Sequence, residues 1–307
     1  MSKSNIKTID PSNVETRVLH KYLLSAIAPR PIAFASTINS AGQVNLSPFS
    51  YFNVFSINPP ICVFSPSRRG RDGSTKDTLE NIKQVPEVVI NIVNYPIIEQ
   101  MSLSSTEYET GVNEFTKSGL TEVPSNVVKP PRVKESPVAL ECTVDKVIEL
   151  GEEGGAGNLI LARVKLVHIQ EEYLNEDGFI DSLKMDLVAR MGDSWYCRAN
   201  EQSMFEIPKP GRNRGIGVDA LPEQIRMSEI LTGNDLGKLG NLESMPTPEE
   251  INSIKESDEV KEIYDRLTLD KEIETELHRL GKKMIERGEI SEALAVMMSN
   301  RIIKEKN

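Results

Sequence analysis

The sequence predicts a mainly β domain, a barrel or a sandwich, followed by a helical extension. Between about residues 20 and 200, runs rich in β-branched and aromatic residues alternate with Gly, Pro and Asn, a pattern typical of strands and turns. Residues 140–145 alternate between apolar and polar, as expected for a sheet with one wet face. Roughly six to eight strands with few helices between them favour an antiparallel barrel or sandwich over a doubly wound parallel sheet.

The order of the elements follows from this pattern. Strands are expected over residues 31–37, 44–55, 61–64, 88–93, 138–148, 159–169 and 187–190, with 195–197 as a partner for the last. The short segments 40–43 and 151–158 lie between strand pairs and are predicted to be hairpin loops. One short helix is expected at Asp77, which would form a capping box with Glu80, and Leu79 and Ile82 give this helix an apolar face.

The last third of the chain differs from the rest. Residues 205–246 are rich in Gly, Pro, Asn and Asp, and we expect them to be an irregular connecting segment. Residues 247–307 are expected to form a helical extension. Thr247 is predicted to cap its first helix, with Pro248 in the first helical position and Glu250 closing a capping box.

Within this extension, apolar residues at helical spacing predict an amphipathic helix that ends at Gly288. The residues of its apolar stripe are Ile273, Leu277, Leu280 and Met284. Ser291 would cap a last helix that carries Leu294, Met298 and Ile302. Because the stripes look too small to form an independent core, we expect the extension up to Lys304 to dock against the barrel or a second subunit.

Composition excludes several classes of function. The 307 residues include 36 Lys and Arg against 46 Asp and Glu, and this acidic balance argues against a nucleic-acid binder. No stretch approaches about 18 uninterrupted apolar residues, and the polar start leads to no apolar core of a signal peptide. We therefore expect no membrane span and no secretory signal. Three widely spaced cysteines suit a reducing cytoplasm, and three distant histidines offer no zinc spacing.

Residues 65–82 are the most informative segment for ligand binding. They contain four cations, Arg68, Arg69, Arg71 and Lys76, together with two glycines and several hydroxyl side chains, and then open a short helix. Free backbone N–H groups at a helix start, next to Arg and Lys, form an anion site, most plausibly for a phosphate. The alternative is an exposed loop whose charges are merely solvated.

A second segment, residues 45–53, combines three aromatic residues with two serines. Aromatic residues in strands are mostly buried in the core, which is the simpler interpretation. The serines, however, stand where apolar residues would be expected. A planar aromatic ligand would use the rings for stacking, and the serines and backbone N–H groups for its polar edge.

Ordered motifs extend over much of the chain. They read PRPIAFAST at residues 29–37, NLSPFSYF at 45–52, KDT at 76–78, GVNEF at 111–115, GLT at 119–121, PPRV at 130–133, ESPV at 135–138 and LEC at 140–142. From about residue 18 to 198 the chain resembles the flavin reductase-like, FMN-binding split-barrel family that includes flavoredoxins. The resemblance implies that residues 1–204 form an antiparallel split barrel, that two copies form a homodimer, and that FMN lies non-covalently near their interface.

The resemblance also implies which residues hold FMN. Ser36 and Thr37 match the strand end near the flavin, residues 47–52 match the lining of the isoalloxazine, and residues 76–78 match the phosphate side. The predicted cofactor-binding residues are Ser36, Thr37, Ser47, Pro48, Phe49, Ser50, Tyr51, Phe52, Ser65, Arg68, Lys76, Asp77, Thr78, Arg190 and Tyr196. Asn113 departs from the family, which more usually has Asp there, and receives no role.

The leading interpretation is an NAD(P)H-dependent flavin reductase, in which hydride passes from NADH or NADPH to flavin N5. Because the cofactor carries this chemistry, no catalytic residue is assigned. One alternative is a flavoredoxin-type FMN electron carrier that is reduced by a protein partner. Another is a flavin-binding or interaction protein without turnover of its own.

Overall fold

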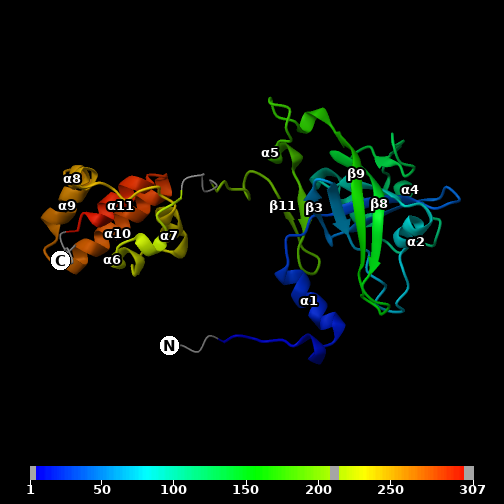
Figure 1. The fold of residues 1–307 in the computed structure, drawn as a ribbon, viewed down its shortest axis with the longest axis horizontal. Helices are drawn as coiled ribbons and strands as arrows, with labels where there is room; N and C mark the ends of the chain where they lie inside the picture. Colours follow the sequence, from blue (N-terminus) through cyan, green and yellow to red (C-terminus); the bar gives the residue numbers. More distant parts are fainter. Residues whose placement is uncertain (1–4, 208–213, 301–307) are drawn as a thin grey trace. The chain divides into compact units, whose positions relative to one another are not determined.

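The protein divides into two compact units, which the computed structural model describes over residues 5–207 and 214–300. The first unit, Met1–Phe205, holds every strand of the described residues, and the described part of the second, Glu206–Asn307, is helical (Figure 1). The two units each have a hydrophobic core of their own.

The first unit is built on a sheet of seven strands in the order β2-β1-β5-β8-β9-β4-β3. These strands are β1 (Ala33–Ile38), β2 (Val44–Phe49), β3 (Phe52–Ile57), β4 (Pro60–Phe64), β5 (Glu87–Ile92), β8 (Val138–Glu149) and β9 (Asn158–Ile169). Two small sheets pair β6 (Glu122–Val123) with β7 (Arg132–Val133), and β10 (Val188–Arg190) with β11 (Tyr196–Arg198). All named pairs are antiparallel, which confirms the predicted mainly β, antiparallel class.

Five α-helices accompany these strands. They are α1 (Thr16–Ala26), α2 (Asp77–Gln84), α3 (Ile98–Leu103), α4 (Glu114–Ser118) and α5 (Ser182–Met185), with 3₁₀ turns η1 (Pro11–Asn13), η2 (Tyr95–Ile97) and η3 (Glu171–Tyr173). Only α2 was predicted. Helix α1 buries none of its residues.

The two predicted hairpins are confirmed, because β1 pairs with β2 and β8 pairs with β9. The single strand predicted over residues 44–55 is wrong. The chain bends at Ser50 and Tyr51, so β2 and β3 become separate strands at the two opposite edges of the sheet. The end of β2 and the start of β3 are three residues apart, a span of at most about 11 Å. The two edges must therefore approach each other there, and the sheet is rolled.

Strand β1 separates two hydrophobic cores. Successive side chains of a strand point to opposite faces, and β1 is buried on both sides. Ala33 and Ala35 belong to a core that also contains Leu79 and Ile82 of α2, which confirms the predicted apolar face of that helix. Phe34 lies in the other core, which is built with α3 and α4.

The start of α2 differs from the prediction. Lys76 is the N-cap residue, it makes no side-chain capping bond, and Asp77 is already the first helical residue. The expected capping box of Asp77 with Glu80 is therefore wrong, because Asp77 lies one position too late along the helix to accept a capping bond. The side chain of Asp77 instead accepts a hydrogen bond from Thr110 at 3.3 Å.

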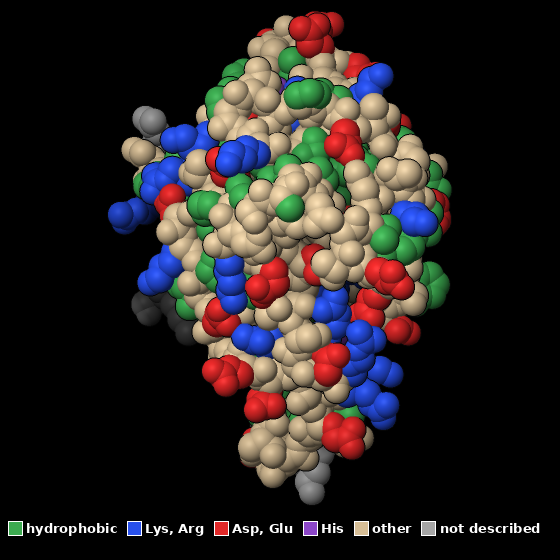
Figure 2. Space-filling view, turned by 90° about the vertical axis from the view of Figure 1, so that its right-hand side faces the viewer, with side chains coloured by type: hydrophobic (Ala, Val, Ile, Leu, Met, Phe, Trp, Pro, Cys, Tyr) green, Lys and Arg blue, Asp and Glu red, His purple; other side chains and the backbone are tan. Residues whose placement is uncertain are grey.

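The surface of the protein carries charges of both signs. On the face of the molecule in Figure 2, Lys and Arg side chains are interspersed with Asp and Glu side chains. Local electrostatics on this face therefore depend on individual pairs of charges rather than on a patch of one sign.

Within the described residues, no helix has both the length and the apolar character needed to cross a membrane.

The second unit is a bundle of short helices around one longer helix. Its elements are η4 (Val218–Ala220), α6 (Glu223–Arg226), α7 (Gly233–Gly240), α8 (Pro248–Lys255), α9 (Asp258–Arg266), α10 (Asp270–Arg287) and α11 (Ile290–Met298). The capping box at Thr247 is confirmed. The Thr247 hydroxyl accepts from the N–H of Glu250 at 3.2 Å, and the Glu250 carboxylate accepts from the N–H of Thr247 at 2.7 Å. Gly288 ends α10 in the left-handed conformation, with φ of 85°.

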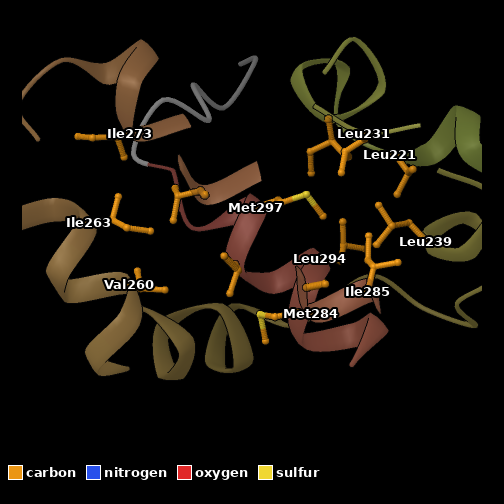
Figure 3. Close-up of a cluster of buried hydrophobic side chains, with 14 residues drawn as sticks. Leu221, Leu231, Leu239, Val260, Ile263, Ile273, Met284, Ile285, Leu294 and Met297 are labelled. Carbon is orange, nitrogen blue, oxygen red and sulfur yellow. The ribbon is translucent and has the colours of Figure 1, made fainter. Parts of the chain in front are cut away.

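One expectation for this unit is wrong, and so is the premise of another. Residues 205–246 are not irregular throughout, because α6 and α7 lie in them and they supply Leu221, Ile225, Leu231 and Leu239 to the core. That core contains 14 buried residues (Figure 3), including Ile273, Leu277 and Met284 of the predicted stripe. The unit therefore has an independent core, and the reason for expecting it to dock no longer holds.

The last helix also differs in detail. It begins at Ile290 with Glu289 as N-cap, so Ser291 lies inside the helix and does not cap it. Leu294 is buried and Met298 packs against the core, as the spacing predicted. Ile302 and Lys304 lie outside the described residues.

We expect residues 206–307, produced alone, to fold into a helical unit with a cooperative thermal transition. Replacing the fully buried Leu277 by Ala should lower its free energy of unfolding by about 2–5 kcal/mol. The control Leu269→Ala, at a side chain that is 61% exposed, should change it by no more than about 0.5 kcal/mol. Circular dichroism during heating and urea titration measures both, and a non-cooperative or unfolded chain would contradict an independent core.

Candidate functional site

Helix α2 is fastened to the sheet by two buried hydrogen bonds. The amide of Asn45 on β2 donates to the hydroxyl of Thr78 at 3.0 Å, and the amide of Asn81 donates to the hydroxyl of Thr37 on β1 at 3.2 Å. Each threonine hydroxyl acts as acceptor here and keeps its own proton for a further bond. These contacts hold the start of α2 beside β1 and β2.

Strand alternation divides the predicted residues of β1 and β2 between two faces. In the β1–β2 pair, Thr37 lies opposite Asn45, Ser47 opposite Ala35, and Phe49 opposite Ala33. Directly opposite residues point to the same face, and Ala33 and Ala35 face α2. Thr37, Ser47 and Phe49 therefore share the face on which α2 packs. Ser36 and Pro48 point to the opposite face, and the buried Ser36 hydroxyl has no hydrogen-bond partner among the described residues. Ser36 and Thr37 therefore cannot line one ligand from the same side.

Lys76 lies directly before α2 and faces this group of residues. Its Nζ atom lies 5.4 Å from the centre of the Phe49 ring, and within the described ranges no carboxylate forms an ion pair with it. Burial, and then the positive charge of Arg69, lower the pKa of Lys76, whereas Glu107 acts in the opposite direction. A half-buried ammonium without a counter-ion, beside the free N–H groups of a helix start, can hold an anion.

The neighbouring cations have different roles. The guanidinium of Arg68 is bonded to Glu149 at 2.7 Å, to the carbonyl of Gly151 at 3.1 Å and to that of Gly73 at 3.2 Å. Ser65 is also engaged with the β8–β9 hairpin, because its hydroxyl accepts from the N–H of Asn158 at 3.0 Å. These two predicted ligands of the cofactor hold the loop onto the hairpin.

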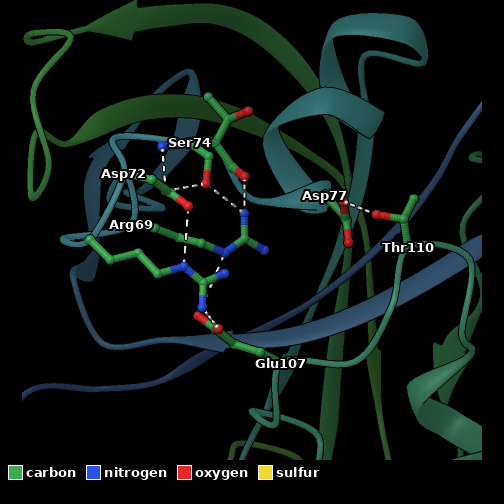
Figure 4. Close-up of polar contacts among 8 residues, drawn as sticks. Arg69, Asp72, Ser74, Asp77, Glu107 and Thr110 are labelled. Atoms are coloured by element: carbon green, nitrogen blue, oxygen red, sulfur yellow. Dashed lines mark hydrogen bonds and ion pairs between the residues drawn. The ribbon is translucent and has the colours of Figure 1, made fainter.

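Figure 4 shows the remaining part of the loop. Asp72 accepts from the N–H of Ser74 at 2.9 Å and from its hydroxyl at 2.6 Å. With the further bond from Arg71, these contacts lower the pKa of Asp72 to about 2. Arg69 donates to the hydroxyl of Ser74 at 3.3 Å and to the carbonyl of Thr75. Arg69 is thus held close to the start of α2.

A residue that sequence reasoning missed, Arg30, connects the bend between β2 and β3 to the β10–β11 hairpin. Its guanidinium is buried and donates to the hydroxyl of Ser50 at 3.4 Å and to the carbonyl of Met191 at 2.9 Å. Two further bonds go to carbonyls of Leu24 and Ile27 at the end of α1. The signals in the sequence were its place between two prolines and its membership of the PRPIAFAST motif at residues 29–37.

The predicted pair Arg190 and Tyr196 lies on this hairpin. The two residues are direct partners in the β10–β11 register, and the Arg190 guanidinium lies 4.6 Å from the centre of the Tyr196 ring. The backbones of Arg30 and Arg190 exchange two hydrogen bonds of 2.9 Å. Ser50, the exposed Tyr51 and the half-buried Phe52 form the bend and the start of β3, so the hairpin is tied to the neighbourhood of that bend.

A cavity of about 670 Å³ lies elsewhere in this unit and contains none of the predicted cofactor residues. Its walls include Arg132, Lys134 and His168. His168 contacts the buried Glu141 at 2.6 Å, and this carboxylate accepts the N–H groups of Asn126 and Val127. The bonds satisfy the carboxylate and fix the loop that carries these N–H groups, so we attribute them to the fold.

The chain is similar to a known protein family and to known relatives. A model of the family described as "Flavin reductase like domain" matches residues 25–183. A relative from Halalkalibacterium halodurans is 35% identical over 208 residues, which cover 67% of this chain and 99% of the relative. A relative from Aquifex aeolicus is 35% identical over 189 residues, 62% of this chain and 94% of the relative.

Solved structures are similar to this chain over about two thirds of its length. Nitrilotriacetate monooxygenase component B from Bacillus cereus is 28% identical with a TM-score of 0.61, over 66% of this chain and 98% of its own. The 2-nitrobenzoate 2-nitroreductase from Pseudomonas fluorescens is 25% identical with a TM-score of 0.57, and the match covers 67% of this chain and 100% of the nitroreductase. A Shewanella frigidimarina protein with a split barrel domain is 27% identical with a TM-score of 0.55, and the match covers 64% of this chain and 95% of that protein. This similarity confirms the split-barrel prediction.

Proposed function

This chain belongs to the flavin reductase-like family, and from that membership we propose that its first unit binds FMN and acts as an NAD(P)H-dependent flavin reductase. The observation that carries the proposal is the half-buried Lys76 at the start of α2, next to the Phe49 ring. An ammonium and a planar aromatic side chain on one face suit the two chemically different ends of FMN. Names of structural neighbours, a monooxygenase component and a nitroreductase, are those of redox proteins.

The residues present fit this cofactor. Lys76 and the first-turn N–H groups of α2 would hold the phosphate, and the hydroxyl protons of Thr37 and Thr78 remain available as donors. Ser47, Phe49 and the bend at residues 50–52 would line the isoalloxazine. Bound FMN supplies hydride acceptance at N5. The protein's part is to orient the ring, to bond its polar edge and to leave one ring face open to the nicotinamide.

The proposal is tested by mixing the purified protein with FMN and NADH or NADPH in the absence of oxygen. We expect the visible absorption band of oxidised flavin to bleach rapidly with at least one of the two nucleotides. Bleaching only with a protein reductant would instead support an electron carrier of flavoredoxin type. Binding of FMN without reduction by either route would support a flavin-binding protein without turnover.

Lys76→Ala should weaken FMN binding more than riboflavin binding, by about 1–2 kcal/mol, because a charge-assisted contact to the phosphate is lost. Fluorescence titration of both flavins measures the difference. The control is Lys83→Ala, which removes an equal charge from the same helix but from a side chain paired with Glu149 at 2.9 Å. Equal losses for the two flavins with Lys76→Ala would reject the phosphate assignment.

We also propose that two copies of the chain associate. Strand β3 is an edge of the sheet, and its Val54, Phe55 and Ile57 side chains are 52%, 71% and 79% exposed. An exposed apolar edge strand favours pairing with another chain. Sedimentation at micromolar concentration should show a dimer, and replacement of Phe55 and Ile57 together by Lys should give a monomer. A wild-type monomer that still binds FMN would contradict a site shared between subunits.

A further inference from the structure

The loop between α3 and α4 places a carboxylate between two of the predicted phosphate-site cations. Glu107 Oε1 lies 3.5 Å from Nε of Arg69, and Glu107 Oε2 lies 3.1 Å from Nη1 of Arg71 (Figure 4). One carboxylate thus spans two guanidinium groups, as an oxygen-rich anion from solution would.

The two arginines do not need Glu107 to stay in place. Arg69 is held by Ser74 and the carbonyl of Thr75, and Arg71 is bonded to Asp72 at 3.1 Å. The Glu107 carboxylate, in contrast, forms no other ion pair or hydrogen bond among the described residues, and its side chain is 57% exposed. An exposed ion pair of this kind contributes little to stability. The carboxylate can leave while the cations remain.

The contact also leaves Arg69 incompletely bonded. The Nε atom of Arg69 is buried and has no hydrogen-bond partner within the described structure, because Glu107 approaches it only as an ion pair at 3.5 Å. A buried donor without an acceptor is costly. A phosphate oxygen in the same place would accept this N–H group, and Lys76 lies close enough to be influenced by both Arg69 and Glu107.

We propose that Glu107 is an internal competitor for the phosphate of the flavin and a residue that sets the preference between flavins. In the free protein its carboxylate occupies the position between Arg69 and Arg71. A phosphate monoester that is held by Lys76 and the start of α2 extends to these two arginines and displaces the carboxylate. A flavin without phosphate leaves it in place. This inference rests on the proposed FMN site. It adds a residue that lowers the affinity for FMN without changing the contacts to the isoalloxazine ring.

The test compares Glu107→Gln with Glu109→Gln in the full-length protein. Glu109 lies two residues further along the same loop and forms no ion pair among the described residues, so its replacement removes an equal charge without freeing Arg69 or Arg71. Fluorescence titration gives the Kd values for FMN and riboflavin. Isothermal titration of the flavin-free protein with inorganic phosphate gives a separate measure of the anion position.

With Glu107→Gln we expect FMN and inorganic phosphate to bind about 3- to 10-fold more tightly, while riboflavin changes by less than about 2-fold. With Glu109→Gln all three should change by less than about 2-fold. Unchanged or weaker FMN and phosphate binding with Glu107→Gln would overturn the inference, as would an equal gain with Glu109→Gln. If the wild-type protein binds neither flavin, the proposed function fails, and the phosphate titration still decides the role of Glu107.

Discussion

The first unit depends on satisfying one buried positive charge. Arg30 as a whole residue is only 6% exposed, so its N–H groups must find acceptors within the protein. They find them on three separate parts of the chain: the end of α1, the turn of the β10–β11 hairpin at Met191, and Ser50 in the bend between β2 and β3. That bend brings the two edges of the rolled sheet together, so the same charge that holds three segments also fixes the residues expected to line the isoalloxazine.

The second constraint is the burial of β1 on both faces. Its small residues Ala33 and Ala35 leave room for α2, and Asn81 of that helix then bonds to Thr37 in the buried interface. The start of α2 is thereby placed next to β2, with Lys76 over Phe49. Pairing of polar groups inside the core, rather than the composition of the loop, decides which cation faces the candidate site.

Much of the fold could be predicted from local pattern, and the failures have a common cause. Strands with alternating residues, both hairpins and the Thr247 capping box depend on neighbours in sequence and were predicted correctly. The break at residues 50–51 was missed, because the aromatic run continues through it and the bend is held by Arg30 from 20 residues away. Residues 205–246 have a loop-like composition, but four of their leucine and isoleucine side chains complete a core whose other members lie after residue 246.

The same reasoning applies to the site. The sequence indicated an anion site in residues 65–82 from its four cations, but the partners of Arg68 and Arg69 lie far along the chain. Glu149, 81 residues from Arg68, neutralises that arginine, and Glu107 comes from a loop between two helices that were not predicted. Asp72 neutralises Arg71 from within the segment. Once these pairs are counted, Lys76 is the one cation of the segment that has no ion-pair partner among the described residues, and it lies on the face of Phe49. Phosphate selectivity at this site should therefore depend on one lysine and on the carboxylate that shields its neighbours, and not on the total charge of the loop.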